Sequence, residues 1–175
     1  DELGWKWAKT LFRPAVRYQA RQHKHLVSDF NYDFAGVEAL LDEYKLLERD
    51  IPENTTEAEF ESIGRLGAQM GSNKNYYGNV ELMAKALADG LSLEGAGEAL
   101  SYGSALAYLS TSYGNPMDSH LHTGTNNRRY LLSKKGVSRR SKVLALLTGF
   151  TGPEVLLAES LLNWESNIES SITQS

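Results

Sequence analysis

A ridge of small side chains runs through residues 93–112. Gly95, Ala99, Gly103, Ala107 and Thr111 recur every fourth position, so a helix places them along one line. Such a bare ridge lets a second helix approach the backbone closely. Two interior glycines cost a helix about 1 kcal/mol each relative to alanine, which packing must offset. We therefore expect a core helix here, packed against another helix.

Helical spacing also marks the segment after Asp33, a residue suited to the N-cap position. The helix is expected to continue until Pro52, because proline interrupts the helical hydrogen bonds. Its buried face is predicted from apolar residues three or four positions apart: Phe34, Val37, Leu41, Tyr44 and Leu47.

Helix start and stop signals divide the next part of the chain. Thr56 and Glu59 have the spacing of a capping box, in which the side chains satisfy unpaired amides at the helix start. We expect Phe60, Ile63 and Met70 on the buried side of this helix.

A polar loop, GSNKNYYGN, separates that helix from a shorter one. Gly90 is expected to end the shorter helix, and Ser92 to cap the ridge helix. The buried face of the shorter helix is predicted to hold Val80, Met83, Ala84 and Leu87.

A further helix is predicted over 116–134. Asn115 supplies a capping side chain, Pro116 suits the first helical position, and Asp118 favours the positive end of the helix dipole. Gly136 is expected to end this helix, and Ser138 to start the next.

Two more helices are expected, one from Pro14 to about Ser28 and one after Gly152. We find no alternating strand pattern of useful length and no repeat of fixed period. The sequence therefore predicts an all-α fold, a single-domain irregular bundle of about seven helices over residues 1–170, with a frayed tail at 171–175.

The charges are segregated, although the net charge is only −4. Residues 29–66 carry eleven acids against three bases, and residues 128–142 carry seven bases and no acid. Complementary blocks in one fold are expected to face one another or solvent, and a sharper alternative is an anionic ligand or partner at 128–142. The acidic balance and the lack of a recognisable motif argue against nucleic acid.

Composition excludes several other classes. The chain has no cysteine, which rules out disulfides, thiol catalysis and cysteine-ligated metal centres. No apolar run approaches the roughly 18 residues that span a bilayer. The chain starts at Asp1 without a leader pattern, which indicates a processed form or a fragment, and the default compartment is the cytoplasm.

The polar face of the 116–134 helix is the main candidate for chemistry. His122, Asn126 and Arg129 lie at i, i+4 and i+7, which combines a titratable base, an amide and a fixed cation. Exposed helix faces favour Glu and Lys, whereas this face suits a partly buried hydrogen-bond network. The alternative is an exposed polar face or a structural histidine.

Metal binding has weaker support. His120 borders the apolar side with Asn127 and points about 160° away from His122, so one metal cannot use both histidines. His23 and His25 split across two faces in the same way. A haem or metal bundle that recruits one histidine from each helix is a third hypothesis, and no Glu-x-x-His pair is present.

Tyrosines could complete a pocket beside His122. Tyr102 and Tyr113 lie on one face of the ridge helix, and Tyr76 and Tyr77 occupy the preceding polar loop as a candidate lid. Core packing explains these tyrosines equally well. The glycine ridge could also pack against a second copy of the chain, so a homo-oligomer is compatible with the sequence.

Two short stretches resemble known families. HLHTGTNNRRYLL, within 117–132, is similar to a helix of the questin-oxidase-like helical proteins. KALADGLSLEGAGEAL, within 83–100, resembles a hairpin of carboxymuconolactone decarboxylase-like proteins, whose redox members use cysteines that this chain lacks. The first resemblance implies oxidation of an aromatic or polyketide-like substrate, with a role for His122.

Three functions follow as hypotheses. The leading one is a small helical enzyme, or the helical domain of an oxidoreductase, that acts on an organic, aromatic or carbonyl-containing substrate between helices 93–112 and 116–134. His122 would act as acid and base, Arg129 would hold an oxyanion, and Asn126 and Tyr102 would orient the substrate. The second is a non-catalytic subunit that docks an acidic partner or anionic ligand through 128–142, and the third is the haem or metal bundle. No particular cofactor is implied.

Overall fold

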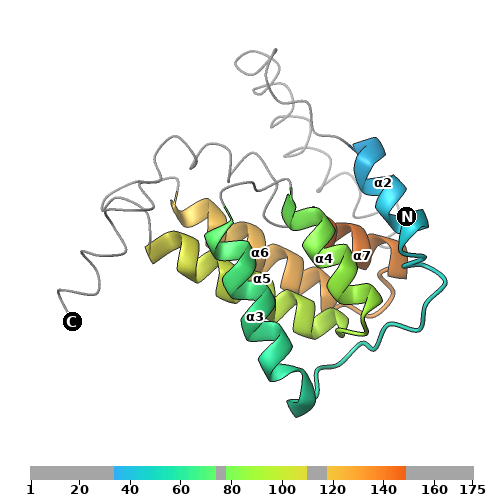
Figure 1. Cartoon of the computed structure of the whole chain (residues 1–175), viewed down its shortest axis with the longest axis horizontal. Coiled ribbons are helices and arrows are strands. Elements are labelled where there is room, and N and C mark those ends of the chain that lie inside the picture. The colour runs from blue at the N-terminus through green and yellow to red at the C-terminus, as the bar shows by residue number, and fades with distance from the viewer. Residues whose placement is uncertain (1–33, 74–77, 110–117, 149–175) are drawn as a thin grey trace, which may run out of the picture. The chain divides into compact units, whose positions relative to one another are not determined.

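The computed structural model describes residues 34–73, 78–109 and 118–148, without the side chains of Phe34, Ala35 and 118–121. Within these ranges the chain forms six α-helices and one 3₁₀ turn, and no strand, which confirms the all-α prediction. The elements are α2 (Phe34–Glu43), η1 (Glu57–Glu59), α3 (Phe60–Ser72), α4 (Gly78–Ala88), α5 (Leu93–Leu109), α6 (Asp118–Leu132) and α7 (Arg139–Leu147) (Figure 1). The helices predicted before Asp33 and after Gly152 lie outside the described residues.

The ridge helix α5 packs against α3 on one face and α6 on another (Figure 1). A Cβ at Gly71 of α3 would lie 2.8 Å from the carbonyl oxygen of Gly103, and a Cβ at Gly67 would lie 2.9 Å from that of Ala99. The two backbones are therefore in direct contact, because glycine removes the side chains between them. The predicted close approach is confirmed, and α3 is the partner.

Most predicted buried faces are confirmed. The four apolar residues assigned to the core from 80 to 87 are all buried. The prediction that Phe60 is buried was wrong, since its side chain is 63% exposed. It lies about two turns before Gly67, away from the close contact with α5, whereas Leu66 and Met70 fill the core.

Helix α2 is shorter than predicted. It ends at Glu43 instead of continuing to Pro52, because Lys45 adopts a left-handed conformation with φ of 51°. As a result, Leu46 is buried and the predicted core residue Leu47 is exposed. Gly90, with φ of 102°, ends α4 as predicted.

The predicted caps are also present. The Thr56 amide donates to Glu59 Oε1 at 3.1 Å, as a capping box requires. The Ser92 hydroxyl accepts from the Gly95 amide at 3.0 Å, and the Ser138 hydroxyl accepts from the Ser141 amide at 3.2 Å. These bonds satisfy amides that a helix start otherwise leaves unpaired.

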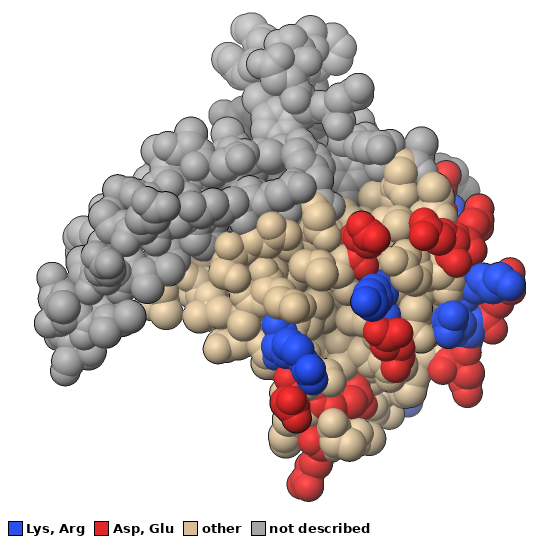
Figure 2. Space-filling model, in the orientation of Figure 1, with Lys and Arg blue, Asp and Glu red and all other residues tan. Residues whose placement is uncertain are grey.

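The acidic and basic blocks of the sequence meet. Arg140 of α7 pairs with Glu38 of α2 at 2.5 Å, and Lys142 pairs with Glu53 at 2.6 Å. On the face shown in Figure 2, basic and acidic side chains lie next to one another. The blocks thus connect α7 with α2 and with the segment before α3. In the part of the chain that the structure describes, no helix is long and apolar enough to cross a membrane.

Candidate functional site: a charged cleft between α5 and α6

Helices α5 and α6 run antiparallel along a shared interface. The Ser104 and Thr125 hydroxyls, both buried, lie 2.7 Å apart and form a hydrogen bond between the helices. At one end the His122 ring meets Tyr108 edge to face, with centroids 4.9 Å apart. At the other end Arg129 forms an ion pair with Glu98. The predicted polar face of 116–134 therefore borders α5.

The structure does not gather the four predicted catalytic residues around one cavity. His122 is half-buried against Tyr108, and Asn126 is exposed, as is Asn127. Tyr102 lies on the other side of α5, where a Cβ on Gly67 of α3 would meet its ring at 2.6 Å. Of the four, only Arg129 lines the cleft described below.

Several other predicted site residues lie outside the described part of the chain. These are His23, His25, Tyr76, Tyr77, Tyr113 and the side chain of His120. Among the described residues, no three His, Asp or Glu side chains are grouped as a metal site.

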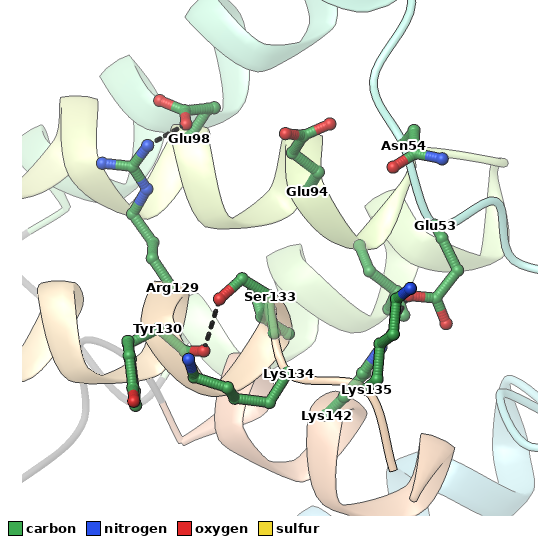
Figure 3. Close-up of a pocket in the computed structure, with 12 residues that line it drawn as sticks. Glu53, Asn54, Glu94, Glu98, Arg129, Tyr130, Ser133, Lys134, Lys135 and Lys142 are labelled. Carbon is green, nitrogen blue, oxygen red and sulfur yellow. Dashed lines mark hydrogen bonds and ion pairs between the residues drawn. The ribbon is translucent and has the colours of Figure 1, made fainter. Parts of the chain in front are cut away.

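A cleft of about 610 Å³ opens between the start of α5 and the end of α6 (Figure 3). Leu93 and Leu132 contribute apolar surface, and charged side chains provide most of the remainder. Three carboxylates come from α5 and from the segment before α3, and four cations come from α6, α7 and the connection between them. The carboxylates are Glu53, Glu94 and Glu98, and the cations are Arg129, Lys134, Lys135 and Lys142.

Two ion pairs join the acidic and basic sides of the cleft. Glu98 binds Arg129, and Glu53 binds Lys142. Figure 3 shows Glu94 on the α5 side between these pairs, with Lys134 and Lys135 opposite. Glu94 accepts a hydrogen bond from the Thr55 amide at 2.8 Å, but it has no cationic partner among the described residues.

Lys142 is the most unusual side chain of the cleft, since it is only 10% exposed. Its ammonium donates to Glu53, whose own side chain is 58% exposed. A lysine ammonium has three N–H donors, and within the described ranges only this one acceptor is present. Since one of three donors is used among the described residues, Lys142 has capacity for another anionic oxygen.

Most other bases of the 128–142 segment serve the fold. Arg128 donates to the carbonyls of Ala145 and Thr148 at 3.1 and 3.0 Å, and so caps the C-terminus of α7. Arg140 binds Glu38 outside the cleft. Arg139 buries Nε and Nη2 without a hydrogen-bond partner in the described ranges.

Lys134 and Lys135 are different. The Lys134 ammonium lies 3.9 Å from the centre of the exposed Tyr130 ring, and Lys135 has no partner in the described part of the chain. The surface that remains available for an anion is thus much smaller than the basic segment suggests. It consists of these two lysines and the ammonium of Lys142.

Glu59 holds the acidic side of the cleft in place. Its Oε2 accepts from the Ser92 amide at 2.9 Å, while Oε1 accepts from Thr56. The next amides of α5 donate to the chain before α3, Leu93 to the Pro52 carbonyl at 2.8 Å and Glu94 to the Glu53 carbonyl at 3.1 Å. The amides at the start of α5 are therefore satisfied within the protein, and the charged side chains, not this helix terminus, must recognise any ligand.

Stability should depend on pH through this carboxylate. Burial raises the pKa of Glu59, but hydrogen bonds from Ser92 and Thr56 outweigh it and lower the pKa below its ordinary value. Its stabilising effect is therefore complete above the ordinary glutamate pKa and is lost as pH falls through the lowered pKa. We expect Glu59→Gln to reduce the free energy of unfolding by about 1 kcal/mol at neutral pH, and the difference to shrink in acid.

Urea denaturation at a series of pH values measures this difference. Glu57→Gln, at an exposed position of the same turn, is the control and should change stability by less than about 0.5 kcal/mol. If the loss in free energy of unfolding caused by Glu59→Gln is the same at neutral and acid pH, the carboxylate charge does not contribute to the cap.

Sequence reasoning missed the main residues of the cleft. Glu53, Glu94 and Glu98 were not among the predicted site residues, and Lys142 was one base among seven in the 128–142 segment predicted to meet an anionic ligand or partner. The complementary charge blocks were the available signal, since they bring Glu53 to Lys142. Comparison with known proteins gives no further direction, because no family model, curated protein or solved structure matches the chain.

Proposed function

We propose that this protein is a non-catalytic helical module that binds the anionic group of a small molecule in the cleft between α5 and α6. The observation that carries the proposal is the largely buried side chain of Lys142, which lines the cleft and whose ammonium has a single acceptor, Glu53, among the described residues. An anionic oxygen would accept a charge-assisted hydrogen bond from this ammonium.

The surroundings of Lys142 support the same ligand class. Lys135 adds a cation without a carboxylate partner in the described part of the chain, and Lys134 adds another beside Tyr130. The ligand would thus meet more positive than negative charge once the two ion pairs are counted. The volume of about 610 Å³ lies within the range of small-molecule sites.

The test is a titration with glutarate, a small dicarboxylate, followed by NMR chemical shifts. We expect saturable shifts of the backbone amides around Lys135 and Lys142. Lys142→Met should weaken binding about tenfold or more, because a charge-assisted hydrogen bond contributes roughly 1.5–3 kcal/mol. The matched control is Arg140→Gln on the same helix, which removes a cation outside the cleft and should leave the affinity unchanged.

Two results would contradict the proposal. One is the absence of saturable shifts in the wild-type protein, and the other is an equal loss of affinity in Lys142→Met and Arg140→Gln. Lys135→Gln, at an exposed position, provides a second variant that should fold normally and bind more weakly. Added salt should weaken the contribution of Lys135 more than that of Lys142, because screening acts mainly on exposed charges.

A second proposal retains an enzymatic role for His122, and its specific support is the edge contact with Tyr108. Packing against the Tyr108 ring can hold the imidazole in one orientation for proton transfer, a role that differs from the substrate orientation predicted for Tyr102. Together with the resemblance to questin-oxidase-like proteins, this supports oxidation of an aromatic substrate in which His122 accepts the proton and an external oxidant such as dioxygen accepts the electrons. Turnover should be lost in His122→Ala and kept in Tyr102→Phe, and an active His122→Ala protein would exclude the role.

A further inference from the structure

The unpaired charges of the cleft indicate that its ligand carries a cationic group as well as anionic groups. Resting on the proposed function, we infer that the ligand is a small zwitterion with one cationic and two anionic groups, such as an acidic amino acid. Its cationic group would bind Glu94, and its anionic groups would bind Lys134 and Lys135, with one of them also accepting a hydrogen bond from Lys142.

The acidic side of the cleft supplies the first reason. Glu53 and Glu98 each pair with a cation, whereas Glu94 has no cationic partner within the described ranges. Among the described residues, the Glu94 carboxylate accepts one hydrogen bond, from the Thr55 amide to Oε2, and Oε1 is available. An anion placed in the cleft would be repelled by this carboxylate unless the ligand also carried a cation.

The charge balance supplies the second reason. The cleft has three carboxylates and four cations, and two pairs join them, so Glu94, Lys134 and Lys135 have no oppositely charged partner in the described part of the chain. A ligand with one ammonium and two carboxylates is the complement of this remainder. Each of its groups would face an opposite charge, and none would be left unpaired.

The third reason is the arrangement of the groups. Figure 3 shows Glu94 on the α5 side of the cleft and the lysines on the opposite side. A dipolar ligand can meet both sides at once, whereas a simple anion meets only one. The Glu98–Arg129 and Glu53–Lys142 pairs stand at either end and limit the length of the bound molecule.

Three probes that differ by single groups test the inference. Glutamate has both carboxylates and the ammonium, glutarate lacks the ammonium, and 4-aminobutanoate lacks one carboxylate. NMR titrations should give glutamate an affinity about tenfold higher than either of the other probes, as expected for one charge-assisted contact.

Glu94→Gln identifies the residue responsible. Glutamine keeps an oxygen for the Thr55 amide, so the loop should stay in place while the negative charge is lost. In this variant glutamate should lose its advantage over glutarate, and glutarate should bind at least as well as before. Glu57→Gln, outside the cleft, should preserve the advantage.

The outcomes separate this inference from the proposed function. If glutarate binds and glutamate binds no more tightly, the ligand is not a zwitterion, and the proposed anion binding is retained. If the advantage of glutamate survives in Glu94→Gln, the assignment of Glu94 is wrong. If 4-aminobutanoate binds with the same affinity as glutamate, the ligand does not need a second anionic group. If none of the probes binds at saturable levels, both the inference and the proposed function fall.

Discussion

Leu46→Ala should lower the free energy of unfolding by about 2–5 kcal/mol, as expected when a large buried side chain is truncated. Leu46 is completely buried, whereas its neighbour Leu47 is 37% exposed. Leu47→Ala is therefore the matched control, and it should cost less than about 1 kcal/mol. Urea denaturation of the two variants measures the difference. A larger loss in Leu47→Ala would mean that α2 continues past Glu43 and buries the other leucine.

The backbone explains why the two leucines differ. The Leu46 amide donates to the Leu41 carbonyl at 3.0 Å, and the Lys45 amide donates to that of Asp42 at 3.2 Å. These are the two bonds of a Schellman motif, with Lys45 at the left-handed position usually taken by glycine. The motif turns the chain after Glu43, so the residue that follows Lys45 enters the core. Gly90 forms the same motif after α4.

Gly71→Ala should lower the free energy of unfolding by about 1–3 kcal/mol, although alanine favours a helix more than glycine does. The added methyl would lie 2.8 Å from the Gly103 carbonyl oxygen and 2.9 Å from Leu106 Cβ. Backbone atoms cannot move aside as a flexible side chain can, so α3 and α5 would have to separate. Thermal and urea unfolding both report this loss.

Gly64→Ala is the control on the same helix. Nothing lies within 4 Å of a Cβ at Gly64, so only the helix preference should change, and stability should rise by up to about 1 kcal/mol. The two substitutions should therefore have opposite signs. If Gly71→Ala were as stabilising as Gly64→Ala, the close contact between α3 and α5 would be absent.

Local signals in the sequence were sufficient for the helices and their caps. The Thr56–Glu59 box, Ser92, Gly90 and Ser138 act within a few residues of their own positions, so their chemistry can be recognised without the fold. The ridge on α5 predicted a close partner but not its identity. That partner depends on Gly67 and Gly71, whose spacing became meaningful only when α3 was placed against α5.

The end of α2 could not be predicted from local preference. Lys45 has no intrinsic tendency toward a left-handed conformation, and Pro52 was the stronger stop signal in the sequence. Burial of Leu46 favours the earlier turn, and burial is a property of the folded chain. The prediction therefore failed by several residues and assigned the core to the wrong leucine.

The candidate site shows the same limit. The spacing of His122, Asn126 and Arg129 is local, and all three residues lie on α6. The cleft next to Arg129 also needs the segment before α3, the start of α5, the connection after α6 and the start of α7. Pairing of Glu53 with Lys142 brings them together, and a sequence shows only that such blocks exist.

The most direct test of the central claim is a crystal structure of the protein with glutarate. We expect one carboxylate of glutarate in the cleft, within hydrogen-bond distance of Lys142 Nζ and close to Lys135. An unoccupied cleft at saturating glutarate, or a glutarate bound elsewhere with Lys142 in contact only with Glu53, would contradict the claim.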